Sequence, residues 1–214
     1  MKDYKEISRK SFNEDAEKFN HEHSNEKFVM KKESYEVVQE EVKKEKFESF
    51  LDVGCGIGNS IELLLQEFPE AHYVGLDIAE KMIEVAKKKN LPNTEFLIGD
   101  AENLPFDHNQ TFDVVICKET FHHFPNPDKF FQEVYRVLNP NGRFIIFDFS
   151  TTEVSRWIKN NITNNFSSHG ICHHYSIPEV TDLYKKFNFD VIRAENVLEE
   201  RMIVCGKKVI KDKT

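Results

Sequence analysis

The feature that most constrains the fold is an alternation, from Glu48 onward, between short apolar runs and amphipathic segments of helical periodicity. Each run is apolar at consecutive positions, as in strands that helices cover on both faces. The runs are SFLDV, HYVGLD, TEFLIGD, FDVVICK and RFIIFDF. This pattern predicts an α/β fold in which a doubly wound, mostly parallel sheet carries helices on both faces.

The end of the chain departs from this alternation. Two strand-like runs, DVIRAENVL and MIVCGKKVI, are separated by only a few residues, which is the spacing of a β-hairpin. We therefore expect an antiparallel pair that closes one edge of the sheet.

The first 48 residues are charge-dense, contain neither glycine nor proline, and carry apolar residues at helical spacing. Phe12 and Phe19 share one helical face. Ser11 and Glu14 form the S-x-x-E pattern of a capping box, which predicts a helix that begins near Ser11. A second helix is expected to follow and to continue to about Phe47.

Three glycines, Gly54, Gly56 and Gly58, follow the first predicted strand, in a chain that has only 8. A glycine-rich turn between a strand and a helix lets a ligand approach the backbone and its exposed N–H groups. Asp77 ends the second strand, where an acidic side chain can bind the hydroxyls of a ribose. A dinucleotide fingerprint would need its third glycine at Asn59, so this spacing disfavours a nicotinamide-dependent oxidoreductase.

Composition narrows the possible partners. The formal net charge of -8 disfavours broad contact with nucleic acid. The four cysteines form no C-x-x-C pair, the N-terminus lacks an apolar leader, and no run is long enough to cross a bilayer. In the segment HGICHHY the adjacent histidines cannot easily face one ion, so no metal site is predicted. We expect a cytoplasmic protein without a membrane span.

Four segments, taken in order, resemble a known family. LDVGCGIGNS, YVGLDIAEKMIEVAKKK, FLIGDAENLPFDHNQTFDVVICKETFHHF and EVYRVLNPNGRFIIFDF are similar to the successive motifs of class I S-adenosylmethionine-dependent methyltransferases. They most resemble the group that modifies small molecules and includes the ubiquinone/menaquinone-type enzymes. The resemblance implies S-adenosyl-L-methionine as cofactor and a seven-stranded sheet with a reversed C-terminal strand. It also implies a turn at NPNG in which Asn141 replaces a glycine and takes the left-handed conformation.

The resemblance assigns cofactor contacts by position. The methionine moiety would lie beside Asp52 and Gly54, and the ribose would bind to Asp77. The adenine would pack against Ile78, Asp100 and Ala101, and the amino-acid end of the cofactor would face the backbone of Lys118. The full set is Asp52, Gly54, Gly56, Gly58, Asp77, Ile78, Asp100, Ala101 and Lys118.

A base is required if the methyl acceptor is a hydroxyl or an acidic carbon. His122 and His123, just past the fourth strand, are the best candidates, with Glu119 and His174 behind them. A purely structural role in the loop is the alternative for His122 and His123. DNA amino-methyltransferases carry a [DNS]-P-P-[YFW] motif where this chain has CKETF, so we expect a small, partly apolar acceptor and no nucleic acid.

The resemblance also suggests how the site is covered. Residues 1–48 would form an N-terminal helical lid segment, and residues 49–214 the cofactor-binding domain. The aromatic segment at about 150–177 is not covered by the resemblance, and we expect it to be a substrate-lid insert. The residues expected to cover the substrate are Phe12, Phe19, Trp157, His174 and Tyr175. A cofactor-binding regulator or inactive partner remains the alternative to an enzyme, and the sequence leaves the oligomeric state open.

Overall fold

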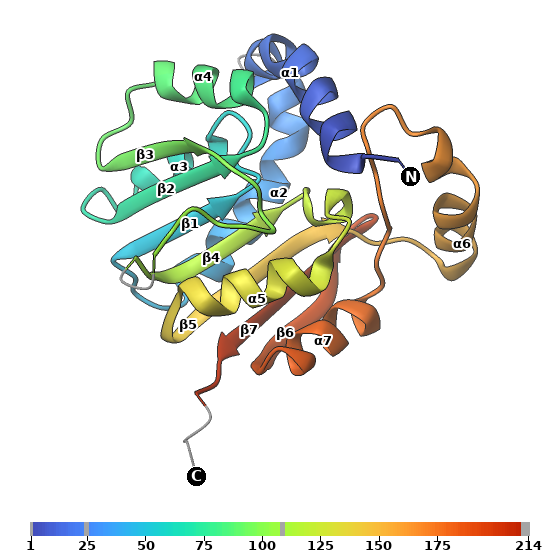
Figure 1. The fold of residues 1–214 in the computed structure, drawn as a ribbon. Helices are drawn as coiled ribbons and strands as arrows, with labels where there is room; N and C mark the ends of the chain where they lie inside the picture. Colours follow the sequence, from blue (N-terminus) through green and yellow to red (C-terminus); the bar gives the residue numbers. More distant parts are fainter. Residues whose placement is uncertain (1, 24–25, 108–109, 211–214) are drawn as a thin grey trace.

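The computed structural model describes residues 2–23, 26–107 and 110–210. Its centre is a seven-stranded sheet in the order β3-β2-β1-β4-β5-β7-β6 (Figure 1). The strands are β1 (Ser49–Val53), β2 (His72–Asp77), β3 (Thr94–Ile98), β4 (Phe112–Lys118), β5 (Leu138–Phe149), β6 (Phe189–Leu198) and β7 (Arg201–Lys208). β7 runs antiparallel to both of its neighbours, and the other pairings are parallel. The predicted sheet with a reversed C-terminal strand is confirmed.

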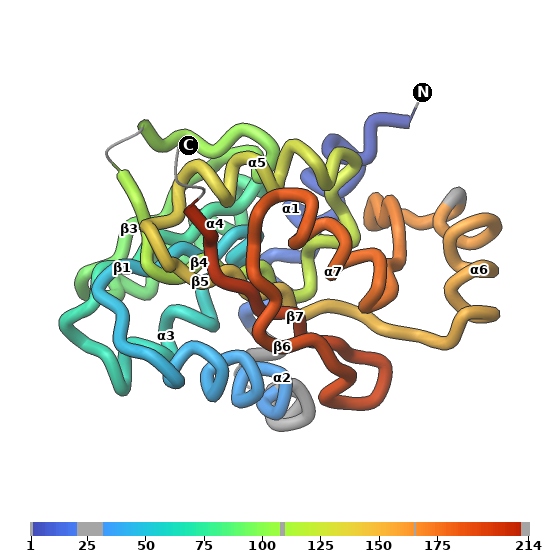
Figure 2. The backbone as a smooth tube through the Cα atoms, turned by 90° about the horizontal axis from the view of Figure 1, so that it is seen from below, coloured from blue at the N-terminus to red at the C-terminus, as the bar shows by residue number. Residues whose placement is uncertain are grey.

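Helices cover both faces of the sheet. The α-helices are α1 (Tyr4–His23), α2 (Glu26–Lys43), α3 (Asn59–Leu65), α4 (Glu80–Lys88), α5 (Pro127–Val137), α6 (Glu153–Asn161) and α7 (Ile177–Lys186), with 3-10 turns η1 (Phe121–His123) and η2 (Thr163–Phe166). α5 and α7 lie on one face and α2 and α3 on the other (Figure 2).

The alternating burial of β4 explains why its sequence is apolar at consecutive positions. Val115 and Cys117 pack into the core under α5 and α7, whereas Val114 and Ile116 pack into the core on the opposite face. Successive side chains of β4 therefore alternate between the two cores, as expected for a strand that is covered on both faces.

Two local expectations have different outcomes. Asn141 has a φ of 61°, so the left-handed conformation expected for it is confirmed. The helix start predicted at Ser11 is wrong, because α1 already begins at Tyr4. The side chain of Asp3 accepts a hydrogen bond from the backbone N–H of Glu6 at 3.1 Å and caps this end of the helix.

α2 is fixed to the sheet by a buried arginine. Arg143 on β5 is 2% exposed, and its guanidinium donates to the backbone carbonyls of Glu41 at 2.7 Å and Val42 at 2.6 Å. The last carbonyls of a helix have no partner within it, so this contact satisfies two of them. Val38 and Val42 of α2 share the core of α3 and the sheet.

α1 crosses the carboxyl ends of the strands and is held there by charged contacts. Lys5 pairs with Asp100 at 2.7 Å and Glu102 at 2.6 Å. Arg9 and Asn13 both donate to the carboxylate of Glu80, each at 2.7 Å. The helix therefore covers the edge of the sheet at which parallel strands present their carboxyl ends, which is where ligands bind in folds of this kind.

Candidate active site

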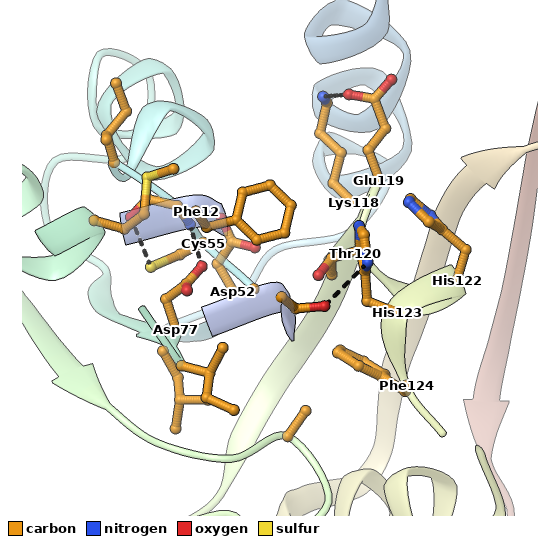
Figure 3. A pocket seen from close by; sticks show the side chains of 18 of the residues that line it. Phe12, Asp52, Cys55, Asp77, Lys118, Glu119, Thr120, His122, His123 and Phe124 are labelled. Atoms are coloured by element: carbon orange, nitrogen blue, oxygen red, sulfur yellow. Dashed lines mark hydrogen bonds and ion pairs between the residues drawn. The ribbon is translucent and has the colours of Figure 1, made fainter. Parts of the chain in front are cut away.

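A cavity of about 410 Å³ lies between α1 and the carboxyl ends of β1, β2 and β4. This volume falls within the range of about 300–1,000 Å³ usual for small-molecule sites. Asp52 and Asp77 lie on one side of the pocket and His122 and His123 on the other (Figure 3). The strand order reverses between β1 and β4, so the cavity lies at the topological switch point of the sheet.

The glycine loop after β1 forms part of the cavity wall. Gly56 has a φ of 54°, and a Cβ built on it would meet no atom within 4 Å. Side chains at Gly54 and Gly58 would instead clash with Thr120 and Phe96. The space above Gly56 therefore belongs to the cavity, whereas Gly58 allows close packing and does not line it.

Asp77 holds the glycine loop in place. One carboxylate oxygen accepts the N–H of Gly56 at 2.8 Å, and the other accepts the N–H of Ala79 at 2.9 Å. Burial raises the pKa of this carboxyl, although the backbone donors oppose the shift. Asp77 also lines the cavity, so it links the shape of the loop to any group bound beside it.

Asp52 carries an unpaired polar atom in the same wall. The side chain is 1% exposed, and its Oδ1 has no hydrogen-bond partner. Burial raises its pKa to about 7, although the charge of Lys118 and a hydrogen bond from Ser60 oppose the shift. A buried carboxyl without a full set of partners favours the approach of a cationic donor.

Three residues expected at the adenine also line the cavity, namely Ile78, Asp100 and Ala101. Asp100 accepts the N–H of Glu102 at 2.9 Å on one oxygen and the ammonium of Lys5 at 2.7 Å on the other. This end of the cavity is thus closed by a side chain from α1.

At the end of β4, Lys118 and Glu119 form an ion pair of 2.8 Å. The Lys118 ammonium lies 3.9 Å from the centre of the Tyr35 ring, and Arg201 donates to Glu119 at 2.9 Å. Burial would raise the pKa of Glu119, but these two cations hold it below its usual value. Glu119 is therefore ionised and already bound to two cations, and it is a weaker candidate for the base.

His122 has the partner expected of a base. Its Nδ1 lies 2.7 Å from Oδ1 of Asp148, and its backbone N–H donates to Oδ2 of the same carboxylate at 3.1 Å. Burial would raise the pKa of Asp148, but the neighbouring His122 lowers it below its usual value. When the His122 ring is neutral, the carboxylate of Asp148 holds its proton on Nδ1, so Nε2 is the nitrogen that can accept a proton.

His123 has different surroundings. Burial, followed by the neighbouring His122, lowers its pKa to about 3. Its Nδ1 lies 3.4 Å from the hydroxyl of Ser8, and Phe12 packs edge-on against the ring at 5.2 Å. His123 is thus neutral and attached to α1.

Not all of the residues expected over the substrate lie at the cavity. Phe12 and Phe19 line it, but Trp157, His174 and Tyr175 do not. Tyr175 stacks on Phe121 at 4.4 Å within the core, and Trp157 is 61% exposed on α6. Trp157 and Tyr175 were predicted from the aromatic character of the insert, which does not distinguish a pocket wall from a core or an outer surface. His174, also predicted as a further base, is buried outside the cavity wall.

The sequence-based predictions did not include the cavity residues Tyr35 and Arg201, or Asp148, which lies outside the cavity wall and pairs with His122. Asp148 had a readable signal, because an acidic residue inside the apolar run RFIIFDF must have a buried partner. Tyr35 and Arg201 reach the site from α2 and β7. No pattern in the sequence around either residue predicts such a long-range contact.

The model of the methyltransferase domain family matches residues 43–197, which include the glycine loop and the cavity-lining ends of β1, β2 and β4. The chain belongs to this family. It is a class I S-adenosylmethionine-dependent methyltransferase, and S-adenosylmethionine is its cofactor. The more specific similarity to the ubiquinone/menaquinone group stays a prediction.

Two curated relatives align with the central part of the methyltransferase. The phthiotriol/phenolphthiotriol dimycocerosates methyltransferase of Mycobacterium tuberculosis is 41% identical over 109 residues, which are 50% of this chain and 40% of the relative. The fatty-acid O-methyltransferase of Mycolicibacterium smegmatis is 40% identical over 99 residues, which are 46% of this chain and 36% of the relative. The chain therefore spans less than half the length of the curated relatives that it matches.

Solved structures agree in fold. A protein from Pyrococcus horikoshii is 25% identical with a TM-score of 0.69, covering 86% of the methyltransferase and 92% of that chain. The magnesium protoporphyrin IX methyltransferase of Synechocystis with bound SAH is 20% identical with a TM-score of 0.71, covering 97% of the methyltransferase and 100% of that chain. The second likeness concerns the fold alone.

Two observations show that the cavity of the methyltransferase fits its cofactor. S-adenosylmethionine carries a sulfonium and an ammonium group, and the unpaired Oδ1 of Asp52 is a buried acceptor for a cation. The empty space over Gly56 allows a ligand to lie against the loop backbone. The described residues contain no group of three or more His, Cys, Asp or Glu side chains that could hold a metal ion.

Proposed function

We propose that this methyltransferase transfers a methyl group to a hydroxyl on a small, partly apolar molecule, with His122 as the base. The observation that carries the proposal is that His122, which lines the cofactor cavity, pairs with a buried, ionised Asp148 behind it. Such a pair is needed to remove a proton and has no evident use in methylating an already anionic group.

The cofactor contacts are proposed from position and chemistry. Asp52 would hold the ammonium, Asp77 the ribose hydroxyls, and the space over Gly56 the body of the cofactor. Ile78, Asp100 and Ala101 would surround the adenine. When bound, the cofactor supplies a methyl group on a positively charged sulfur. The residues of the chain orient that methyl group and exclude water around it.

The proposed base acts at the other side of the cavity. Nε2 of His122 accepts the proton of the hydroxyl that is methylated. At the same time the oxygen of this hydroxyl forms a bond to the methyl carbon, and the bond between that carbon and the sulfur breaks. Asp148 holds the imidazole in the required tautomer and stabilises the positive charge that the ring gains. The products are a methyl ether, S-adenosylhomocysteine and one proton on His122.

The apolar character of the acceptor is supported by the cavity wall. Phe12, Phe19, Phe124, Phe149 and Ile171 line it, and most of the exposed lining surface is apolar, although His123 and Arg201 lie beside two of these rings. Pockets of this composition gain most of their binding energy from apolar contact. Two relatives of the chain are named for their action on apolar molecules, one on dimycocerosates and one on fatty acids.

We further propose that α1 acts as the lid. Phe12 packs on His123, and Lys5 pairs with Asp100, so the helix covers both ends of the cavity. A lid of this kind excludes water from the reacting groups and must move for ligands to exchange.

We expect cofactor affinity to fall as the pH decreases through 7. Because the pKa of Asp52 is raised to about 7, the carboxyl is protonated below this pH and must lose its proton to bind the ammonium. Each pH unit below 7 should then weaken binding by about tenfold, with a plateau above 7. Calorimetric titration at several pH values measures the slope, and Asp52→Asn should abolish it. A parent enzyme with a flat profile would show that Asp52 does not meet the ammonium.

A panel of acceptors tests the proposed function directly. The enzyme should release S-adenosylhomocysteine with long-chain or aromatic alcohols, and it should be inactive with nucleic acid. The carboxylic acid matched in chain length is the informative control, because its methylation needs no base. A preference for the acid would overturn the proposed base, and cofactor binding without turnover on any acceptor would favour a regulatory protein.

A further inference from the structure

The segment between β5 and α7 carries an unusual outer surface. Five large apolar side chains on α6 and η2 are exposed, and we call them the apolar stripe. Their exposed fractions are 71% for Val154, 61% for Trp157, 41% for Ile158, 48% for Ile162 and 86% for Phe166. Residues 154, 158 and 162 lie one helical turn apart, so the stripe follows one side of the helix.

The inner side of the same helix is polar. Asn160 accepts the backbone N–H of His174 at 2.7 Å and donates to its carbonyl at 3.0 Å. Asn164 is 5% exposed and donates to Asn160 at 3.2 Å, and Arg156 is half-buried beside Glu179. α6 is therefore inverted, with polar residues toward the protein and apolar residues toward the outside.

An inverted helix needs an apolar environment outside it. A helix on a surface that faces water normally presents its apolar side to the core, and contiguous apolar patches mark interaction sites. α6 also stands away from the body of the molecule in both views (Figures 1 and 2). Other exposed apolar residues, such as Ile98 and Ile192, lie on different strands away from the stripe.

Charge and composition favour a lipid surface as the occupant. Residues 150–168 contain one acidic residue, Glu153, and two basic ones, Arg156 and Lys159, in a chain whose net charge is -8. The stripe includes the single tryptophan of the chain, and tryptophan and phenylalanine favour the boundary between lipid and water. The segment thus lacks the negative charge that would repel an anionic bilayer.

The segment 150–168 is also continuous with the cavity. Phe149 precedes this segment, His169 and Ile171 follow it, and all three line the cavity. An acceptor leaving a lipid layer beneath α6 would therefore meet cavity residues at both ends of the same segment. The described helices include none that is long and apolar enough to span a bilayer, so contact with lipid through α6 would be peripheral.

We propose that the apolar stripe docks the enzyme on a lipid bilayer surface from which it takes its apolar acceptor. The choice of a bilayer over a protein rests on the proposed function, because an apolar acceptor collects in lipid. The docking itself is measurable without turnover.

Trp157 provides the measurement, because it is the only tryptophan and lies in the stripe. Adding phosphatidylcholine vesicles should shift its emission to shorter wavelength, and bromine-labelled lipids should quench it. The variant with Val154→Ser, Ile158→Ser and Ile162→Ser should partition at least about tenfold more weakly. Ile192, Val209 and Ile210 are exposed apolar residues outside the stripe. The matched control changes these three residues to Ser, and this variant should bind vesicles like the parent.

Two results would overturn the docking proposal. One is an emission spectrum that vesicles leave unchanged. The other is a dimer in buffer, seen by sedimentation, that the stripe variant dissociates, since a second copy would then cover the stripe. Calorimetry with S-adenosylmethionine confirms that the variants fold. If vesicles bind and no apolar acceptor is methylated, the proposed function fails and the docking stands.

Discussion

Replacing Gly56 with leucine should reduce cofactor affinity by at least about 100-fold, because the side chain would fill the space that a ligand needs above the loop. In the structure nothing lies within 4 Å of a Cβ at this position, so leucine fits the protein only by occupying the cavity. Titration calorimetry with S-adenosylmethionine measures the loss, and thermal unfolding measures the change in stability.

Gly56→Ala is the matched control. Both variants place an L side chain at a φ of 54°, so both bear a similar backbone strain of about 1–2 kcal/mol. Alanine adds only the Cβ, and its binding should fall far less than that of the leucine variant. Equal losses in the two variants would mean that strain, and not occupation of the cavity, governs the effect.

Changing His122 to asparagine should lower the turnover rate by about 10²–10⁴-fold while cofactor affinity stays near that of the parent, as for loss of a general base. Asparagine cannot accept a proton but still fits beside Asp148. Single-turnover rates with the acceptor found in the panel measure the effect. His123→Asn is the control, because that ring is neutral and lacks a carboxylate partner. Its rate should fall much less.

The role of Asp148 is separable from simple structural support. Asp148→Asn should lower the turnover rate and shift its pH profile, because the amide no longer fixes the proton on Nδ1 of His122. A variant with an unchanged pH profile and a lower melting temperature would assign Asp148 to stability alone. If His122→Asn turns over at the parental rate, the reaction depends on alignment and not on a base.

The sequence predicted the sheet because its central strands, such as β1 and β4, are buried on both faces, which makes their sequences apolar at consecutive positions. It predicted the cavity side with Asp52, Gly56 and Asp77 because these residues follow two strands whose carboxyl ends meet. Both inferences depend on residues that lie close together in the sequence, and such residues also lie close together in the folded chain.

The remaining features depend on contacts between distant segments. Asp148 reaches His122 across 26 positions, and Lys5 reaches Asp100 across 95. The insert was expected to cover the substrate because it is aromatic, yet its aromatic residues divide between the core and the outer surface. Periodicity places residues on one side of α6, but the tertiary structure decides which side faces outward.

The contacts of α1 have a consequence for the timing of each catalytic cycle. The same helix pairs Lys5 with Asp100 and places Phe12 against His123, so it bridges the place proposed for the adenine and the neighbour of the proposed base. A helix moves largely as one piece, and loosening it at either end frees both. S-adenosylhomocysteine and the methylated product would then be released in the same opening of the lid. The turnover rate would be limited by the detachment of α1.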